Sequence, residues 1–186
     1  MNLDLVVADI ADALKRIDAS RTAFKEFRPG VGPYREPQLV RLLAADLNHL
    51  PAYNRAAKTM RTPDLLLAGH WALEIKLARP FGDNGNLAEN WSVNLLHPYS
   101  GNTSLLGDCL KLQSLERKER KGVIAIGYEH DPPKVPLDPL WKSFELIAEE
   151  VMGVEIGARA LTRRSGLIHP VHQQLIVVGW EILQSS

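Results

Sequence analysis

The sequence contains a single cysteine, no long uncharged apolar run and no excess of charge of either sign. Because Cys109 has no second cysteine to pair with, an intrachain disulfide is excluded and a reducing compartment is favoured. Asp4, Asp9 and Asp12 interrupt the apolar residues near the N-terminus, and a secretory leader does not tolerate charges there. No apolar stretch approaches the roughly 18 residues that a membrane helix needs. We therefore expect a cytoplasmic protein without a membrane segment.

Acidic and basic residues number 22 each, so the chain has no overall positive field that would attract nucleic acid. Any contact with a nucleic acid must then come from a local patch. This balance does not exclude a nuclease, because such an enzyme carries acidic metal ligands beside its basic contacts. The 186 residues, 45% of them hydrophobic and 24% charged, have the length and composition of one globular domain and not of a disordered segment.

The spacing of apolar residues separates helical segments from strand segments. The expected elements, in chain order, are helices at 3–17 and 37–50, a strand hairpin at 64–77, a helix at 104–115, a strand at 122–128, a helix at 140–152 and a strand region at 171–183. This order predicts an α/β sandwich in which helices flank a mixed sheet of hairpin-paired and crossover-paired strands.

The segment 78–103 lies between the hairpin and the third helix and holds three glycines, two prolines and five asparagines. We expect a long loop there, and a long loop in a compact domain is usually functional or mobile. Arg79, at its start, is a candidate contact for substrate. The asparagines and glycines have an equally good explanation as ordinary turn residues.

The pattern that carries chemistry is Pro63-Asp64, nine intervening residues, then Glu74-Ile75-Lys76. A hard cation such as Mg²⁺ binds oxygen ligands, typically one or two carboxylates with water and substrate phosphate. Asp64 and Glu74 are the candidate metal ligands, with the carbonyl oxygen of Ile75 as a further one. Lys76 would orient the attacking water or stabilise charge on the phosphate.

A shared face is the geometric requirement of this pattern. Residues two apart in a strand point the same way, so Glu74 and Lys76 share a polar face while their apolar neighbours point to the other. A two-residue turn at positions 69 and 70 would place Asp64 opposite Ile75, on the wrong face. The metal site therefore predicts a connection of odd length or a bulge.

Pro63-Asp64 with Glu74-Ile75-Lys76, on a hairpin behind a helix and followed by a helix and a strand, resembles the PD-(D/E)xK nuclease superfamily over residues 34–129. The resemblance implies the restriction-endonuclease-like fold, a three-layer sandwich with a mixed sheet of about four or more strands. It also implies a Mg²⁺- or Mn²⁺-dependent endonuclease that cleaves DNA. Glu36 matches the glutamate that this family often carries on the helix before the hairpin.

On this basis residues 1–186 form a single nuclease-like domain. It has N-terminal helices in 1–50, a catalytic core in 64–129, and a C-terminal helix and strand in 138–186. A nuclease that cuts both strands of a duplex at once usually does so as a homodimer, so a second copy of the chain is a candidate partner. No recognition motif indicates a preferred DNA sequence.

Three alternatives remain open from the sequence. The Glu74 and Lys76 pair can be an exposed ion pair on a surface hairpin. The chain can be a binding or assembly module that keeps the fold without catalysis. It can also bind or hydrolyse a small phosphorylated ligand, to which a pocket is better suited than a groove.

Two further pairs of residues invite a functional interpretation. Lys111, one helical turn after Asp108, can reach a phosphate near the metal site, although an ion pair on the helix surface also explains these two residues. His169 and His172 resemble metal ligands, but no third ligand accompanies them in the sequence, so we favour a structural role.

Overall fold

The structure is a computed structural model that describes residues 1–98 and 103–183. Within these residues the sheet has six strands, five α-helices accompany it, and two short turns of other helix types follow α2 and α5. In chain order the elements are α1 (Leu3–Ala19), α2 (Glu36–Leu47), a 3₁₀ turn (Pro51–Tyr53), β1 (Ala57–Thr59), β2 (Leu65–Leu67), β3 (Trp71–Ala78), α3 (Val93–Leu96), α4 (Leu105–Gln113), β4 (Arg120–Glu129), α5 (Asp138–Leu146), a π-helical turn (Ile147–Val151), β5 (Ala160–Arg164) and β6 (Gln174–Ile182).

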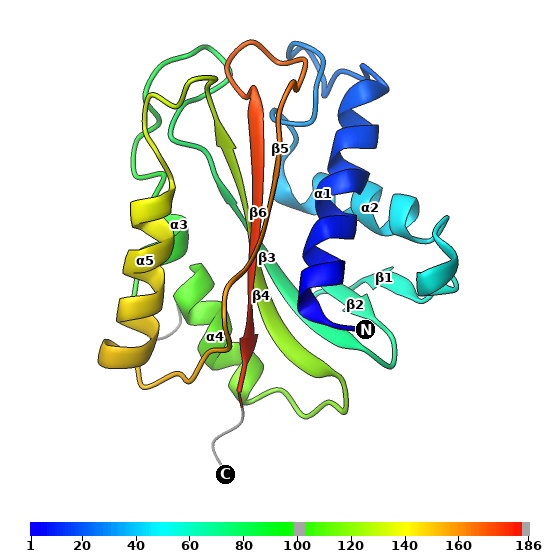
Figure 1. The fold of residues 1–186 in the computed structure, drawn as a ribbon, viewed down its shortest axis with the longest axis vertical. Coiled ribbons are helices and arrows are strands. Elements are labelled where there is room, and N and C mark those ends of the chain that lie inside the picture. The colour runs from blue at the N-terminus through cyan, green and yellow to red at the C-terminus, as the bar shows by residue number, and fades with distance from the viewer. Residues whose placement is uncertain (99–102, 184–186) are drawn as a thin grey trace.

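The sheet lies between two layers of helices. Figure 1 shows it nearly edge-on, with α1 and α2 on one side and α3, α4 and α5 on the other. The strand order is β1-β2-β3-β4-β6-β5, and only the β3–β4 pair is parallel. A parallel pair needs a crossover, which here runs through α3 and α4. The expected α/β class with a mixed sheet flanked by helices is therefore confirmed.

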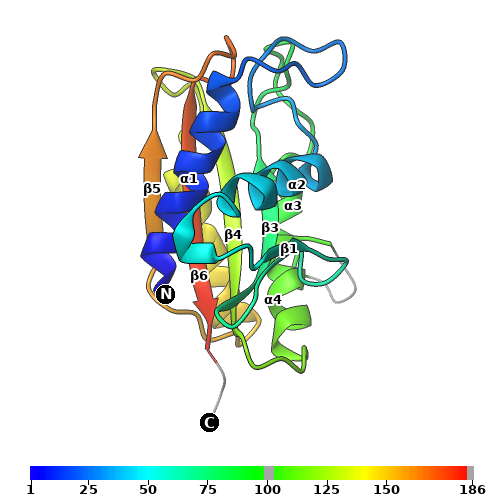
Figure 2. The same cartoon turned by 90° about the vertical axis from the view of Figure 1, so that its right-hand side faces the viewer.

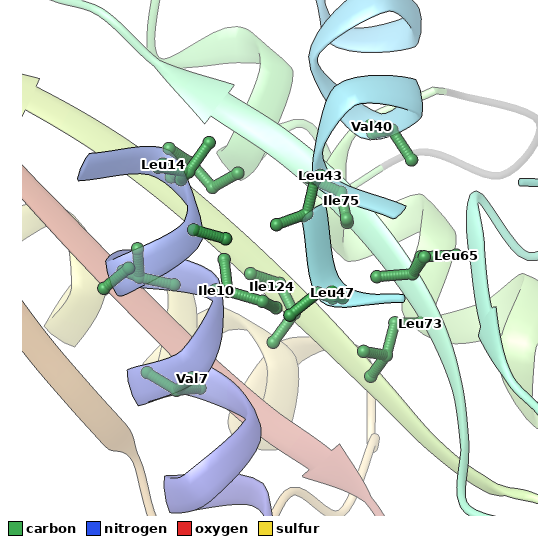
Figure 3. Packing of buried hydrophobic residues seen from close by; sticks show 14 of the residues in the cluster. Val7, Ile10, Leu14, Val40, Leu43, Leu47, Leu65, Leu73, Ile75 and Ile124 are labelled. Carbon is green, nitrogen blue, oxygen red and sulfur yellow. The ribbon is translucent and has the colours of Figure 1, made fainter. Parts of the chain in front are cut away.

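Each face of the sheet packs against its own hydrophobic cluster. On the α1 and α2 side, alternate residues of β3 meet apolar side chains of both helices, such as Ile10 and Leu43 (Figure 3). On the other side, α4 and α5 cover Val123 and Val178 of the two central strands. Both faces of β4 and β6 are thus buried, which explains why their sequences read as continuous apolar runs.

β2 is short, and its length decides where the sheet has an open edge. Its three residues pair with Trp71–Leu73, so the remaining part of β3, Glu74–Ala78, has β4 on one side and no strand on the other within the described residues. α2 lies across the sheet at this level (Figure 2). The candidate motif therefore sits where the open edge of β3 approaches the start of α2.

Two expected elements differ from the structure, and two strands were not expected. β1 and β5 were not expected as strands, because β1 has only three residues and the charged β5 is an edge strand that pairs on one side. The segment 78–103 is not one long loop, since α3 lies within it and buries Leu95. Positions 99–102 of that segment lie outside the described residues. The last strand starts at Gln174, later than expected.

Among the described residues, no helix is both long enough and apolar enough to span a membrane.

Candidate functional site

The β2–β3 connection has the odd length that the metal hypothesis requires. Leu65 pairs with Leu73 and Leu67 with Trp71, which leaves three residues in the turn. Continued by one residue, this register places Asp64 opposite Glu74. The predicted connection of odd length is confirmed.

Asp64 is fixed where the short strand begins. Its Oδ2 atom accepts a hydrogen bond of 2.9 Å from the backbone N–H of Ile75, a donor on the open edge of β3. One carboxylate oxygen thus replaces the missing strand partner, and the carboxyl group also hydrogen-bonds to Glu74. The carbonyl oxygen of Ile75, the proposed third metal ligand, accepts a hydrogen bond of 3.3 Å from Lys76 Nζ.

Glu74 is buried and Lys76 is partly buried, and both lie on the side of β3 that faces α4. Glu74 is 1% exposed and the Lys76 side chain is 11% exposed. Their apolar neighbours Leu73 and Ile75 pack on the opposite face, as expected. The alternative of an exposed ion pair on a surface hairpin is therefore wrong.

Two lysines and three carboxylates form a connected network at this position. Lys76 Nζ lies 2.9 Å from Asp108 Oδ2 and 3.4 Å from Glu36 Oε1. Lys111 Nζ lies 2.8 Å from Glu74 Oε1 and 3.0 Å from Asp108 Oδ1. Glu36, the residue that the resemblance matched to a family glutamate, is the first residue of α2, and it reaches the site through its contact with Lys76.

Helix α4 supplies Asp108, whose role in the site the sequence did not reveal. Ser104 caps the helix by accepting a hydrogen bond of 3.0 Å from Gly107 N–H. Cys109 and Leu112 pack into the core, while Asp108 and Lys111 face β3. Asp108 is only 3% exposed, so its pairing with Lys111 is not a surface ion pair. The sequence showed that Asp108 and Lys111 lie one helical turn apart on one side of the helix, but it did not place Asp108 at the site.

Together with Asp64, which hydrogen-bonds to Glu74, the network carries more negative than positive charge when every group is ionised. Glu36, Asp64, Glu74 and Asp108 contribute four negative charges, and the two lysines offset two of them. The two uncompensated charges equal the charge of one divalent cation. All four acids offer carboxylate oxygens, the donors that Mg²⁺ and Mn²⁺ prefer, so the residues fit such an ion.

The pKa values reflect this crowding. Burial, together with a hydrogen bond to the Asp64 carboxyl group, raises the pKa of Glu74 to about 8 against the lowering effect of Lys111. Burial also raises the pKa of Glu36, and Lys76 opposes that rise. Burial lowers the pKa of Lys76, but Glu36 and Asp108 outweigh it and raise that pKa overall. Lys76 therefore stays charged at neutral pH, whereas Glu74 holds a proton there.

Arg79 and Lys111, the two candidate substrate contacts, differ in how free they are. Arg79 Nη1 donates hydrogen bonds to the carbonyl oxygens of Gly32 at 2.7 Å and Tyr34 at 3.4 Å, so the main chain before α2 holds part of its guanidinium. The Lys111 side chain is 42% exposed, and its long stem allows the ammonium group to turn outward. Of the two, Lys111 is the better placed to contact a phosphate.

Two hollows adjoin Glu36. One is a cavity of about 400 Å³ between the loop before α2 and the segment after β3. The other, of about 160 Å³, is lined by Asp64 as well as Glu36. Glu36 therefore connects both hollows to Lys76, whereas Glu74 and Asp108 line neither of them.

The two histidines near the C-terminus do have a third neighbour, contrary to the expectation. Asp83 approaches His169 and His172, with one ligand atom of each within 4.8 Å of the others. Within the described residues this is the only group of three His, Cys, Asp or Glu side chains that meet so closely. At the acidic network the lysines lie between the carboxylates and hold them further apart.

Hydrogen bonding decides what the histidine cluster can bind. His172 Nε2 lies 3.0 Å from the carbonyl oxygen of Phe81 and must donate to it, which leaves a lone pair on Nδ1. His169 Nδ1 accepts from the N–H groups of Val171 and His172, so its proton is on Nε2. The cluster thus offers one N–H donor and two acceptors, a set that suits a water molecule better than a cation. We place the candidate cation site at Glu74.

Comparison of the chain with models of protein families, with curated proteins and with solved structures found no match.

Proposed function

We propose that the chain is a phosphodiesterase that depends on Mg²⁺ or Mn²⁺, and that it is an endonuclease acting on DNA. The observation that carries this proposal is the meeting of Asp64, Glu74 and Asp108 with Lys76 at the open edge of β3, where Glu36 joins them from α2. Buried carboxylates beside a lysine are costly to a fold unless a ligand uses them, so such clusters are enriched at functional sites.

The ligand set supports a divalent cation. Asp64 and Glu74 are close enough to share a proton, and the positive charge of a cation in place of this proton would offset the burial and the neighbouring Asp64 carboxyl group that raise the Glu74 pKa. When bound, Mg²⁺ supplies charge neutralisation at the phosphate and lowers the pKa of a water molecule. Glu36 and Asp108 would remain at the edge of the site and keep Lys76 in place.

The protein's own groups account for the remaining needs of hydrolysis. Asp108 and Glu36 hold Lys76 Nζ at 2.9 and 3.4 Å, so its ammonium group is directed before substrate arrives. Such a fixed charge stabilises the negative charge that develops on the phosphate without reorganisation. Lys111 would leave Glu74 when a cation binds and would then contact a neighbouring phosphate.

The fold also supports the proposal at the finer level of the restriction-endonuclease-like class. The element order α2, β1, β2, β3, α3, α4, β4 places the motif on the second strand of a hairpin behind a helix, followed by a crossover to a parallel strand. That order agrees with the resemblance noted in the sequence, which covers the same segment.

Cleavage of plasmid, linear and branched DNA in the presence of Mg²⁺ or Mn²⁺ tests the proposal. We expect Asp64→Asn and Lys76→Ala each to lower the cleavage rate at least about 100-fold, because each removes a group that acts on the reacting phosphate. Lys142→Ala is the matched control, since its side chain is 70% exposed on α5. Linear plasmid formed in one event indicates two sites in a homodimer, whereas nicked circles indicate one. Equal cleavage by all three variants and the unaltered chain would refute the proposal.

A non-catalytic binding or assembly module is the second candidate. The observation that favours it is the ion pairing of the carboxylates with Lys76 and Lys111, which partly neutralises the cluster without a metal. Calorimetric titration with Mn²⁺ separates the two functions. Binding that is lost in Asp64→Asn supports the phosphodiesterase, and the absence of binding supports the module.

A further inference from the structure

The cavity of about 400 Å³ beside Glu36 has aromatic walls that the proposed chemistry does not use. Phe24 and Phe27 come from the loop before α2, and Phe81 and Trp91 come from the segment after β3. Its volume falls within the range of roughly 300–1,000 Å³ of small-molecule sites in proteins. Two segments far apart in the sequence thus present aromatic rings to one hollow.

These four rings are less buried than the chain's other phenylalanine and tryptophan side chains. The sequence has four of each type, and the remaining four are fully buried in the core: Trp71, Phe144, Trp141 and Trp180. Every phenylalanine or tryptophan that is not buried therefore lines this cavity. None of the four is fully exposed, because Phe24 and Trp91 also pack against the two core clusters, so each ring presents only part of its surface to the cavity.

Two of the four aromatic rings, Phe24 and Phe81, contact further rings of the fold. Phe24 contacts the ring of Tyr34 with their centroids 5.0 Å apart, and Phe81 meets His130 edge-on at 4.6 Å. The carbonyl oxygen of Phe81 also accepts the hydrogen bond from His172 that anchors the segment after β3. The hollow is therefore part of the folded structure and not a gap between loose loops.

Beside the acids Glu36, Asp83 and Glu89, the lining of the cavity includes groups that can contact a nucleotide. Arg35 and Arg79 offer guanidinium groups for a phosphate, and Asn94 offers an amide that can both donate to and accept from a base edge. Glu36 belongs to the cavity and also contacts Lys76. A base held in the cavity thus places its adjoining phosphate at the acidic network.

We propose that this cavity binds one unpaired nucleobase of the strand whose phosphate lies at the Glu36 and Lys76 site. This inference rests on the proposed phosphodiesterase function. Aromatic rings bind bases by stacking, and the faces of a paired base inside a duplex are covered by its neighbours. The site therefore selects strands with unpaired bases, such as single strands, flaps or flipped-out positions, over a continuous duplex.

Tryptophan fluorescence measures the inference without cleavage, because Trp91 is the only tryptophan that is not buried in the core. In Ca²⁺ buffer we expect a ten-residue thymidine oligonucleotide to quench Trp91, and an abasic oligonucleotide with the same phosphates to quench at least tenfold more weakly. Phe27→Ala should weaken binding of the thymidine strand about tenfold and leave binding of the abasic strand unchanged. Leu87→Ala, 64% exposed in the same segment, is the matched control.

The outcomes separate this inference from the proposed function. Equal quenching by the thymidine and abasic strands, or no effect of Phe27→Ala in a variant that keeps its circular dichroism, overturns the base pocket. Thymidine monophosphate that binds as tightly as the oligonucleotide overturns the assignment to a strand in favour of a small phosphorylated ligand. Base-dependent quenching without metal-dependent cleavage of any DNA overturns the proposed function and leaves the pocket standing.

Discussion

Lys111 is the residue whose position in the network is the least expected, because it occupies the space beside Glu74 that a cation needs. Its ammonium group lies 2.8 Å from Glu74 Oε1 and 3.0 Å from Asp108 Oδ1. Burial lowers the pKa of Lys111, but hydrogen bonds with Glu74 and Asp108 outweigh it and raise that pKa overall. The lysine thus stays charged, and it would compete with the proposed metal ion for the Glu74 carboxylate.

Replacement of Lys111 by an uncharged residue should change the affinity for Mn²⁺ in a predictable direction. We expect Lys111→Met to raise the affinity for Mn²⁺ about three- to tenfold, because one positive charge near the site is lost. Cleavage at saturating metal should fall, since the candidate phosphate contact is lost with it. Isothermal titration and cleavage assays measure the two effects, with Lys142→Met as control. Weaker Mn²⁺ binding in Lys111→Met would show that the lysine supports the metal site.

The raised pKa of Glu74 predicts how metal binding depends on pH. Below about pH 8 the metal-free protein holds a proton on Glu74, and a cation must displace it to bind. Mn²⁺ affinity should therefore increase up to about tenfold per pH unit between pH 6.5 and 8 and then level off. Glu74→Gln should bind weakly and without this slope. An affinity of the unaltered chain that is constant over the range would contradict the prediction.

At the scale of elements, the three-residue turn between β2 and β3 fixes the register that brings Asp64 to Glu74. Gly69 lies in this turn at φ +76°, in the left-handed region that favours glycine. A side chain there would meet no atom within 4 Å, so its cost comes from the backbone conformation alone. A deletion of Gly69, which shortens the turn, can therefore be compared with a substitution of Gly69, which keeps the length of the turn.

Deletion of Gly69 should abolish cleavage, because a two-residue turn moves Asp64 to the other face of the hairpin. Gly69→Ala is the matched control. It should keep wild-type cleavage and lose only about 1–2 kcal/mol of unfolding free energy. Urea denaturation and the plasmid assay measure both quantities. A deletion variant that unfolds cooperatively and cleaves normally would show that the register does not position the site.

At the scale of the whole molecule, Asp18 joins three separate segments. It is 1% exposed at the end of α1, where Oδ1 accepts from Val31 N–H at 3.0 Å and Oδ2 accepts from Ile168 N–H at 2.9 Å. The first donor belongs to the loop before α2, which lines the aromatic cavity, and the second belongs to the loop between β5 and β6. The Asp18 side chain therefore connects α1 to the loop before α2 and to the loop between β5 and β6.

Asp18→Ala should lower the free energy of unfolding by about 2–4 kcal/mol, because two backbone N–H groups lose their buried acceptor. For a chain of this length the melting temperature should fall by about 4–16 °C. Thermal denaturation followed by circular dichroism measures this change. Asp4→Ala, at an exposed position in the first turn of α1, should cost less than about 1 kcal/mol. Equal melting temperatures for the two variants would contradict the role of Asp18.

The sequence by itself determined the class of the fold and the geometry within one hairpin. Helical spacing, strand alternation and short apolar runs are local patterns, so they located α1, α2, β3, α4 and β4 to within a few residues. The requirement that Asp64 share a face with Glu74 also followed from strand geometry alone. β1 and β5 escaped because short and charged edge strands carry little apolar signal.

Only the tertiary structure decided which distant residues join the site. Asp108 and Lys111 reach Glu74 because the crossover packs α4 on the face of β3, and no local pattern sets which face of a sheet a helix covers. The aromatic cavity likewise needs the rings of two segments, Phe27 and Phe81 being 54 positions apart, to meet. Local physics fixes the direction of each side chain along its own element, whereas packing between elements fixes which side chains meet.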